Sequence, residues 1–271
     1  MNKEKINAAL KYWHDRLSNL YNENHIFNIT LYGSQNYGVD TENSDIDVKA
    51  IYVPSLWNAI TKEKWLSKEL INDNNEHCEI KDIREMCKMY KKQNLNFLET
   101  LFTEYRWDNP KYANIHYTFQ TRAEDIAHYD EQYGIKSVCG QALNTIKQLR
   151  KAPSDLKKFS KVIYLYLYLN KYKDNKEEYR NVLQVKDSEK FQNLPARKLL
   201  IDLKANNLNY LIDFLNDQSS TLDYLEQFFI NESKNTKPSE DITNVEYFLN
   251  KTCLDAINQY EAIINGGLHN Q

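Results

Sequence analysis

The chain has 271 residues, which exceeds the usual single-core size of about 100 to 200 residues and leads us to expect one large or two modest domains. Hydrophobic residues make up 41% and charged residues 27%, a balance typical of globular proteins that argues against a disordered, collagen-like or coiled-coil chain. The formal charge of −3 excludes a protein whose whole surface binds nucleic acid electrostatically, but it leaves room for a local basic patch.

The predicted elements begin with a helix and continue with short strands. Residues 4–22 carry apolar side chains at helical spacing. The next segments are rich in β-branched and aromatic residues and are separated by polar, turn-forming stretches. Four strands are predicted, over residues 26–32, 45–53, 65–71 and 76–82.

Beyond residue 82 the apolar spacing becomes helical. The segment 162–169 alternates tyrosine and leucine, which taken alone would score as a strand. Because Pro153 and Asp155 upstream can cap a helix, we interpret it as a buried helix; a tyrosine ladder that stacks bases is the alternative. The predicted helices cover residues 83–90, 95–102, 121–132, 135–150, 155–172, 196–229 (broken near Asn206 and Asn207) and 241–265.

These elements predict an α+β fold. A small mixed β-sheet flanked by helices would form a head over residues 1–125, and an all-α C-terminal domain would follow over residues 126–271. The scarcity of glycine and proline, 6 and 5 residues, agrees with a chain that has few tight turns and many helices.

No targeting or zinc-binding pattern is visible in the sequence. The first residues lack the apolar segment of a signal peptide, no window approaches 18 apolar residues, and the mean hydropathy is −0.74. The four cysteines and six histidines show no CxxC pair and no zinc-ligand spacing, which favours reduced thiols. We therefore expect a cytoplasmic protein without a membrane span.

The candidate chemistry lies on the first two predicted strands. Gly33 and Ser34 end the first strand, and Asp45 and Asp47 begin the second. Alternate residues of a strand share a face, so the two carboxylates would project together, about 7 Å apart, while Ile46 enters the core. They repel each other unless a cation lies between them, and Mg²⁺ or Mn²⁺ prefers such oxygen ligands together with phosphate oxygens. This pattern suggests a two-metal clamp on a triphosphate.

The Gly33-Ser34 pair would bind the phosphates. A glycine that ends a strand lets the backbone approach a phosphate closely, and the amides of a short helix predicted over residues 34–37 would point at the anion. The Ser34 hydroxyl can donate one more hydrogen bond.

These residues resemble the nucleotidyltransferases of the DNA polymerase β superfamily, whose signature is hG[GS] followed by D-h-[DE]-h. Residues 33–52, GSQNYGVDTENSDIDVKAIY, are similar to the GSxxYGLxTxxSDxDxRG stretch of predicted bacterial and phage nucleotidyltransferases. Residues 83–102 are similar to that group's LRKF…NPNxLELLF block. Two departures are Lys49-Ala50 in place of Arg-Gly or Lys-Gly, and Asn96 where proline is common. The His and Arg pair that the group's tail often carries is also missing.

The resemblance implies a third carboxylate on a neighbouring strand. We assign it to Glu79, as metal ligand or general base, with Asp82 as the next choice. Strand alternation puts Glu79 and Lys81 on one face and Ile80 in the core. Lys49 and Lys81 are candidate nucleotide ligands, although Lys81 could equally form a salt bridge with a neighbouring carboxylate.

Two further charged features have two interpretations each. Glu99 is either a carboxylate near the cleft or a partner in a structural salt bridge. A basic stretch surrounds Pro153 and forms either a solvated face or a groove for a triphosphate or a polynucleotide. Its members are Lys147, Arg150, Lys151, Lys157, Lys158 and Lys161.

The sequence thus predicts an enzyme with a two-metal-ion mechanism. It would transfer NMP from an NTP, ATP among them, to a hydroxyl of RNA (such as tRNA), a protein or a small molecule, with release of pyrophosphate. P-loop, Rossmann, hydrolase and zincin motifs are absent. The alternatives are a non-catalytic nucleotide-binding or antitoxin-like interaction module on the same fold, and a helical RNA-binding protein with an accessory head.

Overall fold

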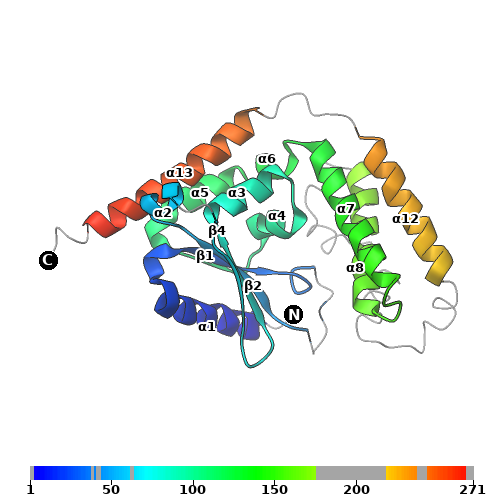
Figure 1. Cartoon of the computed structure of the whole chain (residues 1–271), viewed down its shortest axis with the longest axis horizontal. Coiled ribbons are helices and arrows are strands. Elements are labelled where there is room, and N and C mark those ends of the chain that lie inside the picture. Colours follow the sequence, from blue (N-terminus) through cyan, green and yellow to red (C-terminus); the bar gives the residue numbers. More distant parts are fainter. Residues whose placement is uncertain are drawn as a thin grey trace.

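The computed structural model describes residues 3–37, 40, 44–61, 64–174, 218–236 and 243–266. A mixed sheet lies between helix α1 on one face and a layer of helices on the other, and a second group of helices stands beside them (Figure 1). The predicted α+β fold is confirmed. Within the described residues, no helix is long and apolar enough to cross a membrane.

The sheet has five strands in the order β3-β4-β2-β1-β5. Only β2 and β4 pair in parallel, and the other neighbours are antiparallel. Four strands were predicted. The edge strand β5 was not, because three residues are too few to show an alternating pattern. The bounds are β1 Ile26–Tyr32, β2 Asp47–Tyr52, β3 Ser67–Ile71, β4 His77–Asp82 and β5 Arg106–Asp108.

Helix α1, Lys3–Tyr21, covers one face of the sheet. Its apolar stripe includes Trp13 and Leu17, which are fully buried against strand residues such as Ile29 and Val48. Because alternate strand residues face this helix, the remaining residues of β2, beginning with Asp47, face the opposite side.

Short capped helices cover the other face. The Asp82 side chain accepts a hydrogen bond from Arg84 N (2.9 Å) at the start of α3, and Asn94 accepts one from Asn96 N (3.1 Å) at the start of α4. The sequence did not predict α2 and α5. The bounds are η1 Glu23–His25, α2 Leu56–Thr61, α3 Ile83–Lys91, α4 Leu95–Phe102, η2 Pro110–Tyr112, α5 Ala113–Thr121 and α6 Ala123–His128.

The last described helix, α13 Thr243–Gly266, packs on the same layer. Its Leu249 and Ala256 share a buried core with Ile83 of α3 and Phe119 of α5. The end of the chain therefore covers the sheet together with helices that lie more than a hundred residues earlier.

The second helical group consists of α7 Glu131–Leu149, α8 Leu156–Asp174 and α12 Gln218–Lys234. The predicted helix over residues 121–132 ends early instead, because Asp130 caps a new helix by accepting a hydrogen bond from Tyr133 N (2.9 Å). The alternating segment is helical, as predicted, and Tyr164 and Tyr168 are buried in the core of this group. The break predicted near Asn206 lies outside the described residues.

Candidate functional site

A cavity of about 250 Å³ opens between the strand ends and α8. The head contributes Gly33, Ser34, Asp45 and Asp47 to its lining. The opposite wall is formed by side chains of α4, α7 and α8, among them Asn96, Glu99, Gln141, Lys157 and Lys161. The structure thus brings together four of the seven predicted site residues, and it adds a wall formed by α4 together with α7 and α8.

Gly33 begins a tight turn, residues 33–36, which we call the β1 turn. Its φ of +85° lies in the region that favours glycine, and a Cβ there would lie 4.0 Å from Asp47 Oδ2. Asn36 N donates to Gly33 O (3.0 Å), and Asn36 Nδ2 donates back to Leu31 O (2.8 Å). These bonds fold the chain back on itself, so the short helix predicted over residues 34–37 was wrong and the segment is a turn.

The β1 turn leaves two backbone donors unused. Across the described ranges, the N–H groups of Ser34 and Gln35 make no hydrogen bond. Successive free N–H groups in a turn form a concave site for an anion. The N–H of Gly33, by contrast, donates to Glu99 Oε2 (3.2 Å).

Asp45 and Asp47 line the cavity on the side of β2. Asp47 is the first residue of the strand, opposite Tyr32 of β1, and its Oδ1 accepts a hydrogen bond from His77 N (3.3 Å). Burial raises the pKa of the Asp47 carboxyl, and the neighbouring Asp45 carboxylate also acts to raise it. A divalent cation would relieve this repulsion.

The donor set fits Mg²⁺ or Mn²⁺. Both side chains supply hard oxygen ligands, and Mg²⁺ commonly takes only one or two protein carboxylates, with water and phosphate oxygens at its other positions. Among the residues that the structure describes, no group of three or more His, Cys, Asp and Glu side chains is arranged to hold a metal ion. The remaining ligands of such an ion would therefore come from the nucleotide and from water.

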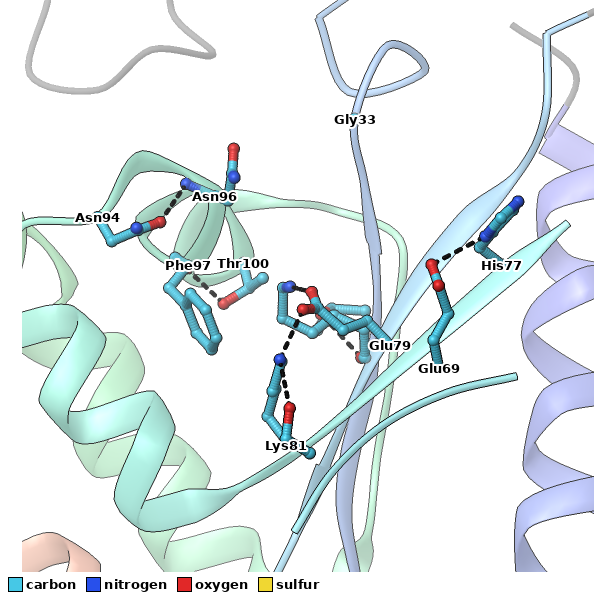
Figure 2. Close-up of polar contacts among 12 residues, drawn as sticks. Gly33, Glu69, His77, Glu79, Lys81, Asn94, Asn96, Phe97 and Thr100 are labelled. Carbon is cyan, nitrogen blue, oxygen red and sulfur yellow. Dashed lines mark hydrogen bonds and ion pairs between the residues drawn. The ribbon is translucent and has the colours of Figure 1, made fainter. Parts of the chain in front are cut away.

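Glu79 lies on β4 between two lysines, outside the cavity lining. Lys49 Nζ contacts its Oε2. Lys81 Nζ lies 2.9 Å from Glu79 Oε1, and Figure 2 shows these two side chains facing each other. Burial acts to raise the pKa of Glu79, but the two lysines outweigh it, and the pKa is lowered. Glu79, Lys49 and Lys81 are thus brought to one another rather than to Asp45 and Asp47.

The burial of Lys49 explains this arrangement. Its side chain is 1% exposed, with Nζ 4.6 Å from the ring centre of Tyr32 and 4.4 Å from that of Phe97. Lys49 lies directly opposite Glu79 in the parallel β2–β4 pair. Lys49 lies two residues beyond Asp47, about 6.6 Å along the strand, and it does not line the cavity. Within the described part of the chain, Lys49 forms its ion pair with Glu79.

Asp82, the second choice for a third carboxylate, caps α3. Besides the hydrogen bond from Arg84 N, its Oδ2 pairs with Arg84 Nη2 at 2.7 Å, and the side chain is 1% exposed. It does not line the cavity.

Glu99 of α4 lines the cavity. Its side chain is 1% exposed, and Oε2 accepts hydrogen bonds from Gly33 N (3.2 Å) and Asn36 Nδ2 (3.4 Å). Burial raises the pKa of Glu99 to about 7. Of the two interpretations, the carboxylate near the cleft is the one the structure supports, since Glu99 forms no salt bridge with any described residue. Its position four residues after Leu95, on the apolar side of a short helix, is the sequence signal for this burial.

Helix α8 supplies two cations to the cavity. Lys157 and Lys161 are four residues apart and therefore share one face of the helix. Lys157 Nζ lies 3.7 Å from Asp45 Oδ2. Desolvation lowers the pKa of Lys161, and the Glu99 carboxylate counteracts that effect. Arg150 and Lys158 of the same basic stretch pair instead with surface carboxylates.

The comparison with known families agrees with this geometry. Residues 4–134 match the RlaP family, described as the RNA repair pathway DNA polymerase beta family. The matched range contains the whole sheet, the β1 turn, both aspartates and Glu99. A search of curated proteins found no match. This match, which spans just under half of the chain, supports a polymerase β-like nucleotidyltransferase superfamily for residues 4–134.

Proposed function

We propose that this protein is a metal-dependent nucleotidyltransferase that transfers NMP from an NTP to a hydroxyl group and releases pyrophosphate. The observation that carries the proposal is the shared cavity. Gly33, Ser34, Asp45 and Asp47 face Lys157 and Lys161 across it, so an anionic triphosphate and its cation would each find ligands of opposite charge.

In this proposal, Asp45 and Asp47 hold the divalent cation. A metal ion bound there supplies charge neutralisation for the triphosphate and lowers the pKa of the attacking hydroxyl. The chain itself orients the substrate. The N–H groups of Ser34 and Gln35 and the Ser34 hydroxyl donate to phosphate oxygens, and Lys157 and Lys161 neutralise phosphate charge from the opposite wall.

The roles of Glu79, Lys49 and Lys81 remain predictions. Because Glu79 is held by two lysines outside the cavity lining, we assign the cation primarily to Asp45 and Asp47. If Glu79 is the third carboxylate, Glu79→Gln should reduce kcat as strongly as loss of Asp47. If its task is to neutralise Lys49, the same variant should mainly reduce stability.

We propose RNA as the acceptor. The support is the description of the matched family, which names an RNA repair pathway. A hydroxyl of a protein side chain or of a small molecule is the other outcome that the test below distinguishes.

The test is to incubate the protein with each α-labelled NTP, with Mg²⁺ or Mn²⁺, and with total RNA or protein extract. The comparison is an Asp45→Ala, Asp47→Ala double variant, with Asp73→Asn, an exposed carboxylate on the β3–β4 turn, as the control. We expect label in RNA with wild type and control only. Equal labelling by the double variant, or none with any NTP and metal, would refute the transferase. Label confined to protein would refute RNA as the acceptor.

A further inference from the structure

The Glu99 carboxyl group is buried with one oxygen unsatisfied. Oε2 accepts the two hydrogen bonds from the β1 turn, whereas Oε1 has no partner at hydrogen-bond geometry among the described residues, although the neighbouring Tyr37 hydroxyl favours the ionised carboxylate. A buried polar atom without a partner is costly and uncommon in folded proteins. Glu99 also lines the cavity, so this unfavourable burial of a polar atom occurs at the proposed phosphate site.

Glu99 belongs to a network that ties the β1 turn to α4. Asn36, which is 2% exposed, donates through Nδ2 to Leu31 O (2.8 Å) and Glu99, and its Oδ1 accepts from Thr103 Oγ1 (2.8 Å). Thr103 directly follows α4. The turn is thus held by Glu99 of α4 and by Thr103 directly after it, and Figure 2 shows Gly33 at the strand end beside this helix.

This anchoring determines which amides remain available. The Gly33 N–H is directed to Glu99, while those of Ser34 and Gln35 make no hydrogen bond within the described residues. A triphosphate needs those two N–H groups held in one orientation before it arrives, since ordering them on binding would reduce its affinity.

We propose that Glu99 is a positioning residue that holds the β1 turn in its phosphate-binding conformation; this inference rests on the proposed function. Its task is to accept hydrogen bonds from Gly33 and Asn36. A neutral side chain of the same shape can accept them too, so the carboxylate charge is dispensable for binding. A metal ligand or general base would instead require the charge.

The two roles are separated by comparing Glu99→Gln with Glu99→Ala. Glutamine keeps an oxygen at the same reach, whereas alanine leaves Gly33 N–H and Asn36 Nδ2 without their acceptor. The readout is calorimetric binding of inorganic tripolyphosphate with Mg²⁺, which needs no knowledge of the base or acceptor, followed by KM and kcat with the NTP that supports labelling. Glu104→Gln, an exposed carboxylate close by, is the matched control.

We expect Glu99→Gln to bind tripolyphosphate within about threefold of wild type and Glu99→Ala to bind at least about tenfold more weakly, the loss typical of a buried hydrogen bond to a charged group. The same ratio should appear in KM, with kcat much less affected. Thr103→Val, which removes the second anchor, should also weaken binding and serves if Glu99→Ala fails to fold.

Three results would overturn the inference. Equal losses in the glutamine and alanine variants would show that the charge is required. Unchanged binding in folded Glu99→Ala, or in Thr103→Val where the alanine variant does not fold, would show that the anchor is not needed. If wild type itself does not bind tripolyphosphate, the proposed function fails along with the inference; binding by wild type that Asp45→Ala, Asp47→Ala abolishes keeps that function intact whatever Glu99 does.

Discussion

Ionisation of Glu99 should lower the free energy of unfolding as the pH rises. The carboxyl group is 1% exposed, and burial raises its pKa to about 7 from an ordinary value of 4.5. Between these values the folded chain binds more protons than the unfolded chain, so stability that is fully present below pH 4.5 is lost as the pH rises through 7. At about 1.4 kcal/mol per pKa unit, the rise to about 7 corresponds to about 3 kcal/mol.

The groups around Glu99 determine where the transition falls. Several groups favour the ionised form of Glu99 and so counteract the rise in its pKa that burial causes. Among them are Lys49 from β2, the Gly33 N–H and the Asn36 amide. Lys161 from α8 interacts with the same carboxylate across the cavity, and the hydroxyl groups of Tyr32 and Tyr37 also respond to its charge.

The assay is urea denaturation of wild type and Glu99→Gln between about pH 4 and pH 9, with Glu104→Gln as control. Titrating groups that do not interact with Glu99 cancel in the difference between the two proteins. Wild type should lose about 3 kcal/mol relative to Glu99→Gln across this range. Parallel stability curves, or a wild type that gains stability relative to the variant as the pH rises, would refute the reasoning.

The remaining predictions concern the cavity and the elements that support it. Lys157→Ala and Lys161→Ala should each raise the KM for the NTP about tenfold, with little change in kcat, because each removes a charged partner of the triphosphate; Lys136→Ala, on the exposed side of α7, should change neither. Asp82→Ala should lower the free energy of unfolding by roughly 3 to 5 kcal/mol, measured by urea denaturation, because it removes a helix cap and breaks a buried ion pair. Gly33→Ala should cost about 1 to 2 kcal/mol, since the φ of +85° strains any residue with a Cβ.

Each of these expectations has a contrary result. A lowered kcat with unchanged KM in the α8 variants would place the lysines at the reacting groups rather than on the phosphates. A loss of kcat in correctly folded Asp82→Ala would return Asp82 to the catalytic centre. Wild-type stability in Gly33→Ala would mean that the turn tolerates a different backbone conformation.

The sequence predicted the local structure well where periodicity was long enough to measure. The β-branched and aromatic composition of β1, the alternation at the start of β2 and the helical spacing in α1 depend only on near neighbours in the chain, so they can be read directly. Strand β5 has three residues, too few for a period, and the turn after Gly33 depends on a hydrogen bond from Asn36 back to Leu31 O that composition does not reveal.

The candidate site, too, was predicted only where it depends on near neighbours in the chain. Face parity correctly put Glu79 and Lys81 on one side of β4 and Ile80 in the core. Parity does not give the register between strands, however, and that register sets Lys49 opposite Glu79. The contributions of Glu99 and of Lys161 depend on how α4 and α8 pack across the cavity, which a single sequence does not encode locally.

The most direct test of the central claim is to measure pyrophosphate release and labelled NMP incorporation in one reaction with an α-labelled NTP, Mg²⁺ and RNA. The account predicts equal amounts of both products with wild type, and neither with the Asp45→Ala, Asp47→Ala variant, which lacks the two carboxylates that line the cavity. Nucleotide consumed without label on the acceptor, or unchanged transfer by the double variant, would contradict it.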